Sequence, residues 1–206
     1  MPDFACRNPR ESAFWDERFA QGFTPWDRGG VPQQLHAFVA ASRPLTTLIP
    51  GCGMGYELSA LCEAGWDATA LDFAPVAVAS ARAAVGQWSA RIVVADFFDY
   101  APPAALELVY ERAFLCAMPR ALWPQVAARW AALLAPGTLL AGYFFFDEAV
   151  KGPPFGIDRA TLDSLLLPYF TCIDDAAVTD SIPVFQDKER WMVWRRRDPS
   201  PPAISL

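Results

Sequence analysis

Three glycines, Gly51, Gly53 and Gly55, follow a short apolar run and precede a helical pattern. Glycine lets the chain take left-handed conformations and lets a ligand approach the backbone closely. A phosphate-binding loop would read G-x-x-x-x-G-K-[ST], and no lysine follows these glycines. A dinucleotide fingerprint, G-x-G-x-x-G, would need its third glycine at Tyr56 or at Leu58. The loop therefore favours a ligand that is neither a nucleoside triphosphate nor a dinucleotide.

An acidic residue accompanies this loop, because Asp72 ends the next strand-like run, residues 67–72. A carboxylate there can accept hydrogen bonds from both hydroxyl groups of a ribose, while the glycines let the backbone touch the rest of the ligand. S-adenosylmethionine has a ribose and no phosphate. The pattern predicts this cofactor, with S-adenosylhomocysteine as its product; a glycine-rich turn without a ligand is the alternative interpretation.

The stretch VADFFDY, residues 94–100, places Asp96 at the predicted end of the third strand. Ligands of open α/β sheets bind at the carboxyl ends of the strands. The Asp96 carboxylate, or a neighbouring backbone amide, is a candidate partner for an adenine edge, and Phe97 and Phe98 are candidates to flank the ring. The other interpretation is that Asp96 only caps a turn and that both phenylalanines are core residues.

Alternating strand-like and helical runs must position these residues. Strands are predicted over residues 45–50, 67–72, 91–98, 106–112, 138–146, 172–179 and 188–197. Helices are predicted over residues 32–42, 56–65, 74–86, 120–137 and 158–170, after a short helical pattern near the N-terminus. The strands are apolar nearly throughout, which is typical of a parallel sheet that is covered on both faces.

We therefore expect one domain, residues 1–206, with a Rossmann-like, doubly wound α/β fold. Its sheet should have seven mostly parallel strands, with residues 188–197 as an antiparallel edge strand because that run is more polar. Residues 1–44 should form an N-terminal helical cap on an α/β core of residues 45–197.

Composition and charge narrow the range of partners. The net charge of −6 disfavours a nucleic-acid substrate, which needs a basic face. The five cysteines form no C-x-x-C pair and His36 is the single histidine, so we expect no metal site. No apolar run suits a membrane span, and no signal-peptide pattern is present. These features predict a reduced, cytoplasmic protein with a small-molecule substrate, as a monomer or weak homodimer.

Several stretches occur in an order that resembles one family: FWDERF, PWDRG, LIPGCGMGYE, ALDFAP, ADFF, YERAFLCAMP, LLAPGTLL and GPPF. This chain resembles the thiopurine S-methyltransferase-like class I methyltransferases over roughly residues 12–196. That group includes thiol, thiocyanate and halide methyltransferases as well as the thiopurine enzymes. The two N-terminal tryptophans and GPPF are more specific to the group than the glycine loop, which many methyltransferases share.

The resemblance implies roles for individual residues. Glu111 and Arg112 would be the catalytic residues beside the sulfonium and the substrate, and Trp15 and Trp26 would close over the cofactor. The implied cofactor contacts are Trp15, Trp26, Gly51, Gly53, Asp72, Phe73, Asp96, Phe97 and Glu111. The substrate pocket would include Phe19, Phe114 and Phe155. Thiopurine enzymes tend to have DRGALVA where this chain has ERAFLCA, so Phe114 should narrow the pocket and favour the thiol and thiocyanate branch.

Methyl transfer from a sulfonium is a one-step displacement, in which the nucleophile lies in line behind the methyl carbon at about 3 Å. Thiolate, thiocyanate and halide are already anions, and Arg112 would attract and orient them. We expect S-adenosylmethionine-dependent methylation of a small soft nucleophile, a thiol or thiocyanate-like sulfur. Thiopurine, halide or metalloid methylation and a non-catalytic S-adenosylmethionine-binding protein stay open; the missing dinucleotide fingerprint disfavours a nicotinamide oxidoreductase.

Overall fold

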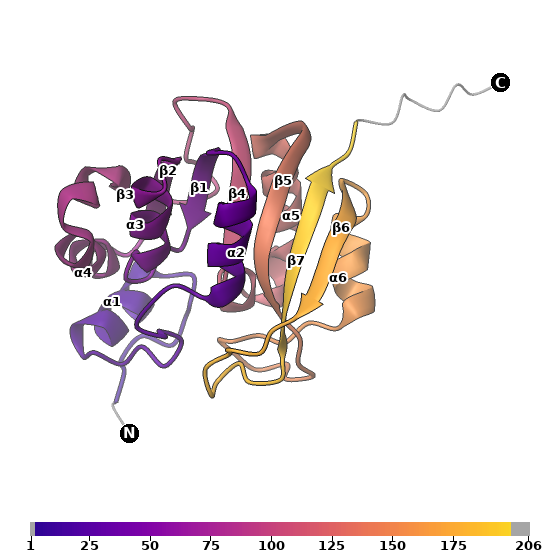
Figure 1. The fold of residues 1–206 in the computed structure, drawn as a ribbon. Coiled ribbons are helices and arrows are strands. Elements are labelled where there is room, and N and C mark those ends of the chain that lie inside the picture. The colour runs from indigo at the N-terminus through magenta and orange to yellow at the C-terminus, as the bar shows by residue number, and fades with distance from the viewer. Residues whose placement is uncertain (1–2, 199–206) are drawn as a thin grey trace.

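The computed structural model describes residues 3–198, and the ends of the predicted single domain, 1–2 and 199–206, lie outside these residues. Seven strands form one sheet in the order β3-β2-β1-β4-β5-β7-β6 (Figure 1). Every neighbouring pair from β3 to β5 is parallel, whereas β7 runs antiparallel to β5 and to β6. The strands are β1 (Thr46–Pro50), β2 (Asp67–Asp72), β3 (Ile92–Val94), β4 (Leu106–Arg112), β5 (Leu134–Phe145), β6 (Phe170–Ala177) and β7 (Glu189–Arg196). The predicted seven-stranded, mostly parallel sheet is confirmed.

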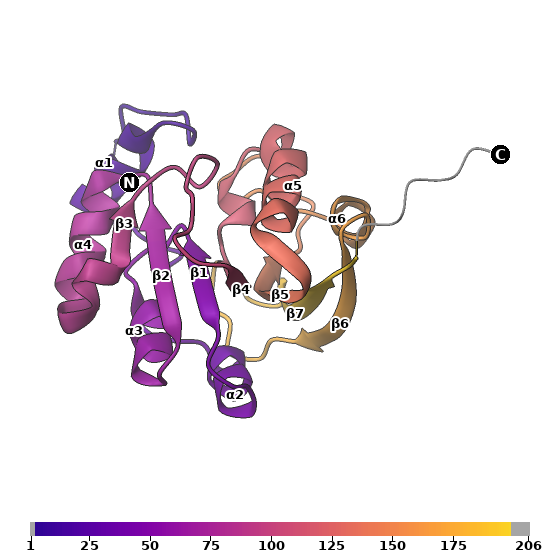
Figure 2. The ribbon, with the colours of Figure 1, turned by 90° about the horizontal axis from the view of Figure 1, so that it is seen from above.

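Helices cover both faces of the sheet. Seen from above, α2 and α3 lie on one side and α5 and α6 on the other (Figure 2). The helices are α1 (Ser12–Ala20), α2 (Gln33–Ala41), α3 (Tyr56–Glu63), α4 (Pro75–Val85), α5 (Trp123–Leu133) and α6 (Arg159–Leu166), with short 3-10 turns over Gly86–Arg91, Leu115–Ala117 and Arg120–Leu122. The buried residues accordingly form two large clusters, one that includes Trp130 of α5 and Leu162 of α6 and one that includes Leu35 of α2 and Leu61 of α3. Burial of apolar surface on both faces explains why the strands are apolar throughout.

Two predicted elements differ from the observed ones. The strand predicted over residues 91–98 ends at Val94, and the chain after it turns to line the cavity described below. The helix predicted over residues 120–137 ends at Leu133, because β5 already begins at Leu134 and pairs there with Leu106. Pro124 does not disturb this helix, since it stands in the first turn, where a missing N–H costs little.

The antiparallel strand was predicted at the edge, and it lies one place in from the edge. β6 pairs along β7 from Phe170 to Ala177 and forms the outer strand. Four consecutive residues of β7, Trp191 to Trp194, are buried, as an interior strand with two covered faces requires. β6 instead carries Asp174 and Asp175, and charged residues on an edge strand discourage pairing with another chain.

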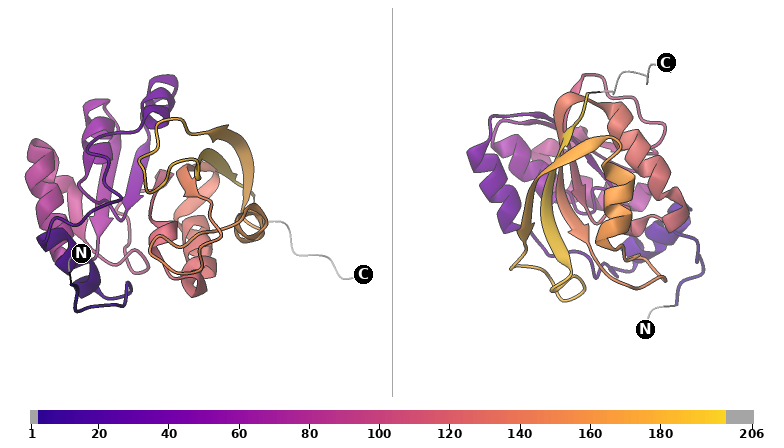
Figure 3. Two further views of the ribbon diagram at one scale, coloured as in Figure 1. Left: turned by 90° about the horizontal axis from the view of Figure 1, so that it is seen from below. Right: turned by 90° about the vertical axis from the view of Figure 1, so that its right-hand side faces the viewer.

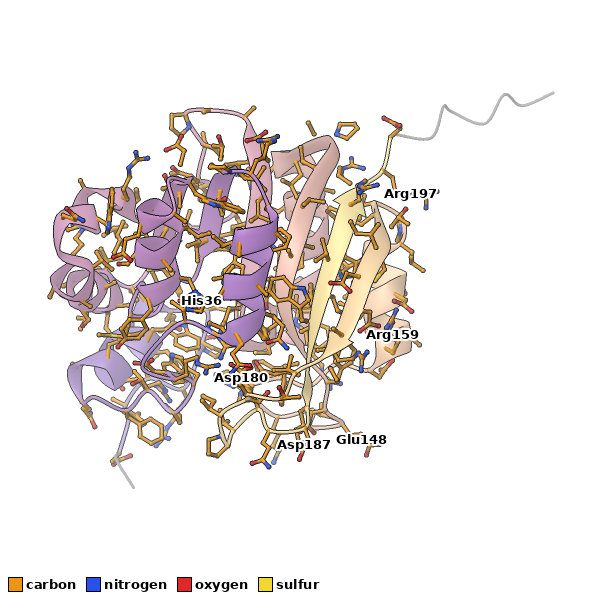
Figure 4. The ribbon with its side chains drawn as sticks, in the orientation of Figure 1. His36, Glu148, Arg159, Asp180, Asp187 and Arg197 are labelled. Atoms are coloured by element: carbon orange, nitrogen blue, oxygen red, sulfur yellow. The ribbon has the colours of Figure 1, made fainter. Side chains whose placement is uncertain are left out.

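The predicted N-terminal cap of residues 1–44 divides into two parts. α1 lies below the carboxyl ends of β1 and β2 (Figures 1 and 3), and the Val76 N–H at the start of α4 donates to Asp16 Oδ1 over 2.8 Å. α2 instead packs on the sheet, where Leu35 is fully buried. His36, labelled in Figure 4, is exposed on α2 and does not line the cavity. Only α1 and the segment up to α2 therefore serve as a cap.

Candidate active site

A cavity of about 700 Å³ opens where β1, β2 and β4 end. β1 lies between β2 and β4, so the chain leaves these neighbouring strands in opposite directions at this point. Ligands of open α/β sheets bind in the crevice that this reversal creates. Of the site residues predicted from sequence, those that line the cavity are Trp15, Phe19, Trp26, Gly51, Gly53, Asp72, Phe73, Asp96, Phe97, Arg112 and Phe114.

The glycine loop connects β1 to α3 through three left-handed residues. Gly51, Gly53 and Gly55 have φ of 62°, 53° and 77°. A Cβ on Gly51 would stand 2.8 Å from Phe114 Cδ2, and a Cβ on Gly55 would stand 2.8 Å from Val85 Cγ1. A Cβ on Gly53 would meet nothing within 4 Å, so this glycine presents its backbone to open space in the cavity. Gly51 and Gly55 thus allow close packing, and Gly53 allows close approach of a ligand.

Asp72 ends β2 and lines the cavity as predicted. Its Oδ1 accepts a hydrogen bond from the Ala74 N–H over 2.9 Å. Burial raises the pKa of this carboxyl group to about 6, although the amides of Ala74 and Phe73 act to lower it. A carboxylate that loses water on folding favours hydroxyl donors from a ligand, which fits the ribose of S-adenosylmethionine.

The loop after β3 supplies the next part of the wall. Asp96 Oδ1 accepts a hydrogen bond from the Phe98 N–H over 2.8 Å, so this side chain does cap a turn, and it lines the cavity as well. The ring of Phe97 packs edge-on against Phe114 with centroids 4.9 Å apart. Phe97 therefore belongs to the core and to the cavity wall at once.

The N-terminal segment brings aromatic rings over the cavity. Trp26 packs against Trp15 with centroids 5.6 Å apart and against Phe19 with centroids 6.0 Å apart. Trp15 Nε1 donates to the Pro9 carbonyl over 2.9 Å, which fixes its ring. Arg28 and Asp180 form an ion pair of 2.9 Å that ties the end of this segment to the loop after β6; Figure 4 labels Asp180 there.

Arg112 ends β4 and lines the cavity between two carboxylates. Its Nε lies 3.7 Å from Glu57 Oε1, and its Nη1 lies 3.3 Å from Glu189 Oε1. All three side chains are at least 86% buried, with exposed fractions of 10% for Arg112, 14% for Glu57 and 4% for Glu189. The ring of Tyr143 lies 4.7 Å from the guanidinium carbon. Arg112 therefore lines the cavity, and its charge is already matched by two protein carboxylates.

Glu111 and Phe155 are not where the resemblance implied. The Glu111 side chain is 1% exposed and does not line the cavity; its Oε1 accepts hydrogen bonds from the amides of Phe114 and Leu115 over 3.2 and 3.1 Å. It braces the turn in which Ala113 has a φ of 55°. Phe155 packs against the core, and the preceding residues 152–154 line the cavity in its place.

Glu57 and Tyr110 are among the polar residues of the cavity that sequence reasoning missed. Glu57 stands in the first turn of α3, where acidic residues are common because they complement the helix dipole, so its type alone gave no signal. Tyr110 alternates in β4 with Glu111, and its hydroxyl is buried without a hydrogen-bond partner among the described residues. Its position two residues before Arg112, on the same face of the strand, was the available signal.

The cofactor predicted from the sequence fits these residues. Gly53 offers bare backbone, Asp72 offers a half-buried carboxylate for two hydroxyl groups, and aromatic rings line the same cavity. Residues 3–198 contain no group of three or more metal-ligating side chains, and none of their helices is long and apolar enough to cross a membrane.

Solved structures share this Rossmann-like fold. The chain is similar to 1,6-didemethyltoxoflavin-N1-methyltransferase from Burkholderia thailandensis, solved with S-adenosylhomocysteine, with a TM-score of 0.74, 20% identity and coverage of 96% of this chain and 94% of that one. It is also similar to magnesium protoporphyrin IX methyltransferase from Synechocystis PCC 6803, solved with S-adenosylmethionine, with a TM-score of 0.70, 16% identity and coverage of 93% and 99%. These likenesses confirm the predicted fold.

The chain belongs to the thiopurine S-methyltransferase (TPMT) family, whose model matches residues 10–197. Thiocyanate methyltransferase 1 from Arabidopsis thaliana is 28% identical over 194 residues, which are 90% of this chain and 86% of that protein. The probable thiol methyltransferase 2 of the same plant is 30% identical over 76% of this chain and 73% of its own length. A thiopurine S-methyltransferase from Vibrio cholerae is 27% identical over 77% and 82%. This chain is therefore an S-adenosylmethionine-dependent methyltransferase, as the sequence predicted.

Proposed function

We propose that this enzyme transfers the methyl group of S-adenosylmethionine to the sulfur of a small molecule, a thiol or thiocyanate-like nucleophile. One observation carries the proposal: a single cavity joins the glycine loop and Asp72 to Arg112 through an aromatic wall. The names of the relatives support it, because thiocyanate, thiol and thiopurine methyltransferases all act on sulfur.

Within this proposal the cofactor half of the cavity has defined residues. Asp72 would hold the ribose, Gly51 and Gly53 would contact the methionine part, and Asp96 and Phe97 would hold the adenine. Phe73, next to Asp72, lines the same part of the wall. Trp15 and Trp26, on the N-terminal segment, would cover the bound molecule.

The protein would contribute alignment and a dry site rather than a reactive group of its own. When bound, S-adenosylmethionine supplies an activated methyl group on a sulfonium. Aromatic rings around the cavity can stabilise a positive charge through their faces, and their bulk excludes water. Arg112 would orient the nucleophile with the donors that its two ion pairs leave unused; its Nη2 has no hydrogen-bond partner among the described residues.

The wall near Arg112 supports a small substrate. Phe114 and Cys116 are 5% and 6% exposed and border the cavity together with Met118. These are apolar or weakly polar groups, which suit a soft sulfur nucleophile better than a heavily hydrated one. Phe19 lines the same cavity from α1.

We also propose the domain organisation, oligomeric state, substrate class and cellular location that the sequence predicted. The enzyme would act as a single domain, as a monomer or weak homodimer, on a small molecule and not on nucleic acid. A cytoplasmic location is supported by its five cysteines, all of which are free, since disulfides are uncommon in the reducing cytosol.

Calorimetry and a product assay test this function. We expect micromolar binding of S-adenosylmethionine and S-adenosylhomocysteine, and release of S-adenosylhomocysteine when 2-mercaptoethanol or thiocyanate is added. Binding without turnover of any sulfur nucleophile would leave a non-catalytic cofactor-binding protein. Faster turnover of 6-mercaptopurine than of both small probes would transfer the assignment to the thiopurine enzymes.

A further inference from the structure

Glu57 is a carboxylate of the cavity for which the mechanism above has no use. It lines the cavity from the first turn of α3, and its ion pair with Arg112 is long, at 3.7 Å. Glu189, the other carboxylate on Arg112, is buried and does not line the cavity. Of the two carboxylates that share this guanidinium, Glu57 is the one that a substrate can touch.

The charges around Arg112 bear on which form of the substrate enters. Two carboxylates and one guanidinium together carry one net negative charge when all are ionised. The sulfonium of bound S-adenosylmethionine would bring this sum to zero, so no positive charge is left to balance an anionic nucleophile. Such an anion would lie beside the Glu57 carboxylate in a poorly solvated site, where charge interactions are strong. A neutral thiol would meet no such repulsion, and it would bring a proton that some group must accept.

The groups that face Glu57 come from several elements. Tyr110 and Arg112 lie on β4, Asp27 and Arg28 lie on the N-terminal segment, and Cys52 lies in the glycine loop. Burial raises the pKa of Glu57 above its usual range, with a smaller rise from Asp27, while Arg112 and Arg28 act to lower it. A carboxylate with a raised pKa is closer to the proton affinity of a thiolate and is a better proton acceptor for it.

We propose that Glu57 is the general base of the reaction and that the substrate is a thiol bound in its neutral, protonated form. This inference rests on the proposed sulfur methylation. It differs from the expectation that an anion enters ready for attack and is drawn in by Arg112.

The step balances in atoms and charge. The thiol sulfur forms a bond to the methyl carbon, while the bond from that carbon to the sulfonium sulfur breaks and its electron pair returns to that sulfur. The thiol proton passes to a carboxylate oxygen of Glu57, so one positive sulfonium and one negative carboxylate both become neutral. Glu57 then releases the proton to solvent through the cavity opening.

Other candidates for the base fit less well. The Glu111 carboxylate is turned toward backbone amides outside the cavity, and Asp27 Oδ1 accepts the Gly29 N–H over 2.8 Å. Burial raises the pKa of the Cys52 and Cys116 thiols and of the Tyr110 hydroxyl. These groups are therefore protonated and cannot act as the base.

The decisive experiment compares two nucleophiles over pH 6 to 10 in wild-type enzyme and in Glu57→Gln. 2-Mercaptoethanol must lose a proton, whereas thiocyanate is an anion throughout. An aliphatic thiol is at most a few per cent ionised at pH 7. Glu57→Gln should therefore lower kcat/KM for 2-mercaptoethanol about 10- to 100-fold at that pH. The rate of the variant should recover at higher pH, where the thiol ionises without a base. Its rate with thiocyanate should be unchanged or higher.

Two controls make the result specific. Glu63→Gln alters an exposed carboxylate at the other end of α3 and should leave both rates unchanged. Calorimetry should show the same S-adenosylmethionine affinity, within about threefold, in all three proteins. The wild-type profile is a second measurement that needs no variant. With a base in place, the 2-mercaptoethanol rate should be level over the pH range between the raised pKa of Glu57 and the pKa of the thiol.

Each contrary outcome has its own meaning. A wild-type rate that rises tenfold per pH unit up to the thiol pKa shows that only thiolate reacts and overturns the base. An equal loss with both nucleophiles in Glu57→Gln shows a structural role and overturns it too. Wild-type enzyme that binds S-adenosylmethionine and methylates neither probe overturns the proposed function itself, and the base with it.

Discussion

The Cβ that Gly51 lacks would stand 2.8 Å from Cδ2 of Phe114, so the glycine loop packs closely against the part of the cavity wall that Phe114 forms. Gly51 follows β1, and Phe114 follows β4, the strand beside it. The glycine loop and the residue predicted to narrow the substrate pocket therefore form one continuous part of the cavity wall. A substitution of either residue should therefore alter both the glycine loop and the part of the cavity wall that Phe114 forms.

Three alanine substitutions separate packing from ligand contact in this loop. All three glycines are left-handed, so each substitution should cost about 1–2 kcal/mol in the free energy of unfolding. Gly53→Ala should also weaken S-adenosylmethionine binding tenfold or more, because its methyl group would occupy open cavity. Gly55→Ala, whose methyl group would press on Val85 outside the cavity, is the matched control and should lose stability with little direct effect on affinity.

Chemical denaturation and calorimetry on these variants would check the assignment. Gly51→Ala should show both defects, since its added methyl group presses on Phe114. Equal affinity in Gly53→Ala and in the wild type would mean that no ligand approaches the backbone at this residue.

We expect ionised Asp72 to lower the free energy of unfolding and to strengthen cofactor binding. The pKa of folded Asp72, about 6, lies above the value of about 3.9 for an exposed aspartate, so its contribution to stability is present below about pH 4 and is lost as the pH rises through 6. Asp72→Asn cannot ionise and should raise the free energy of unfolding at pH 8 by up to about 3 kcal/mol. The same variant should bind S-adenosylmethionine far more weakly, because an amide oxygen replaces a charged acceptor.

Denaturant unfolding at pH 4 and pH 8, with titration of the cofactor at pH 8, measures both effects. Wild-type affinity should itself fall as the pH is lowered through about 6, as Asp72 takes up a proton. Unchanged calorimetric affinity for S-adenosylmethionine in Asp72→Asn would show that Asp72 does not hold the ribose.

Arg112 should matter for turnover and for folding. Arg112→Ala would leave Glu57 and Glu189 without their shared cation, and the loss of one partner from a buried ion pair typically costs about 3–5 kcal/mol. We expect retained cofactor binding, loss of turnover and a clear loss of stability. Adding Glu189→Gln should restore part of the stability and none of the turnover. Full turnover in Arg112→Ala would remove this residue from the mechanism.

Much of the fold followed from local patterns. The apolar strands, the left-handed glycines and the carboxylate at the end of β2 are each set by residues close together in sequence, and the structure shows all three. Residues 188–197 were predicted as the edge strand, because the polar ends of β7 outweighed its buried centre, Trp191 to Trp194. Burial on both faces is the signal that would have placed β7 inside the sheet.

The site was harder to predict where partners are distant in the chain. Glu57 and Arg112 form an ion pair only because β1 and β4 are neighbours in the sheet. The type of neither residue predicts its partner from the sequence. Glu111 stands next to Arg112, yet successive residues of a strand point to opposite faces. Its carboxylate is therefore directed away from the cavity and into the turn that follows, a consequence of strand geometry that the family motif did not convey.

Glu111→Gln tests this reassignment. Its amide oxygen can still accept the hydrogen bonds of Phe114 and Leu115, so turnover and S-adenosylmethionine affinity should stay within about threefold of the wild type. Burial raises the pKa of Glu111 to about 8, above the value of about 4.3 for an exposed glutamate. Its contribution to stability is therefore present below about pH 4 and is lost as the pH rises through 8.

The variant should consequently lose less stability than the wild type between pH 6 and pH 9, because glutamine has no proton to release. Denaturant unfolding at those two pH values, together with steady-state rates at pH 7, gives both readouts. A folded Glu111→Gln protein that binds the cofactor normally and has lost turnover would return Glu111 to the catalytic group. Normal turnover with a flatter stability profile would establish it as the brace of the turn that holds Phe114 against Gly51.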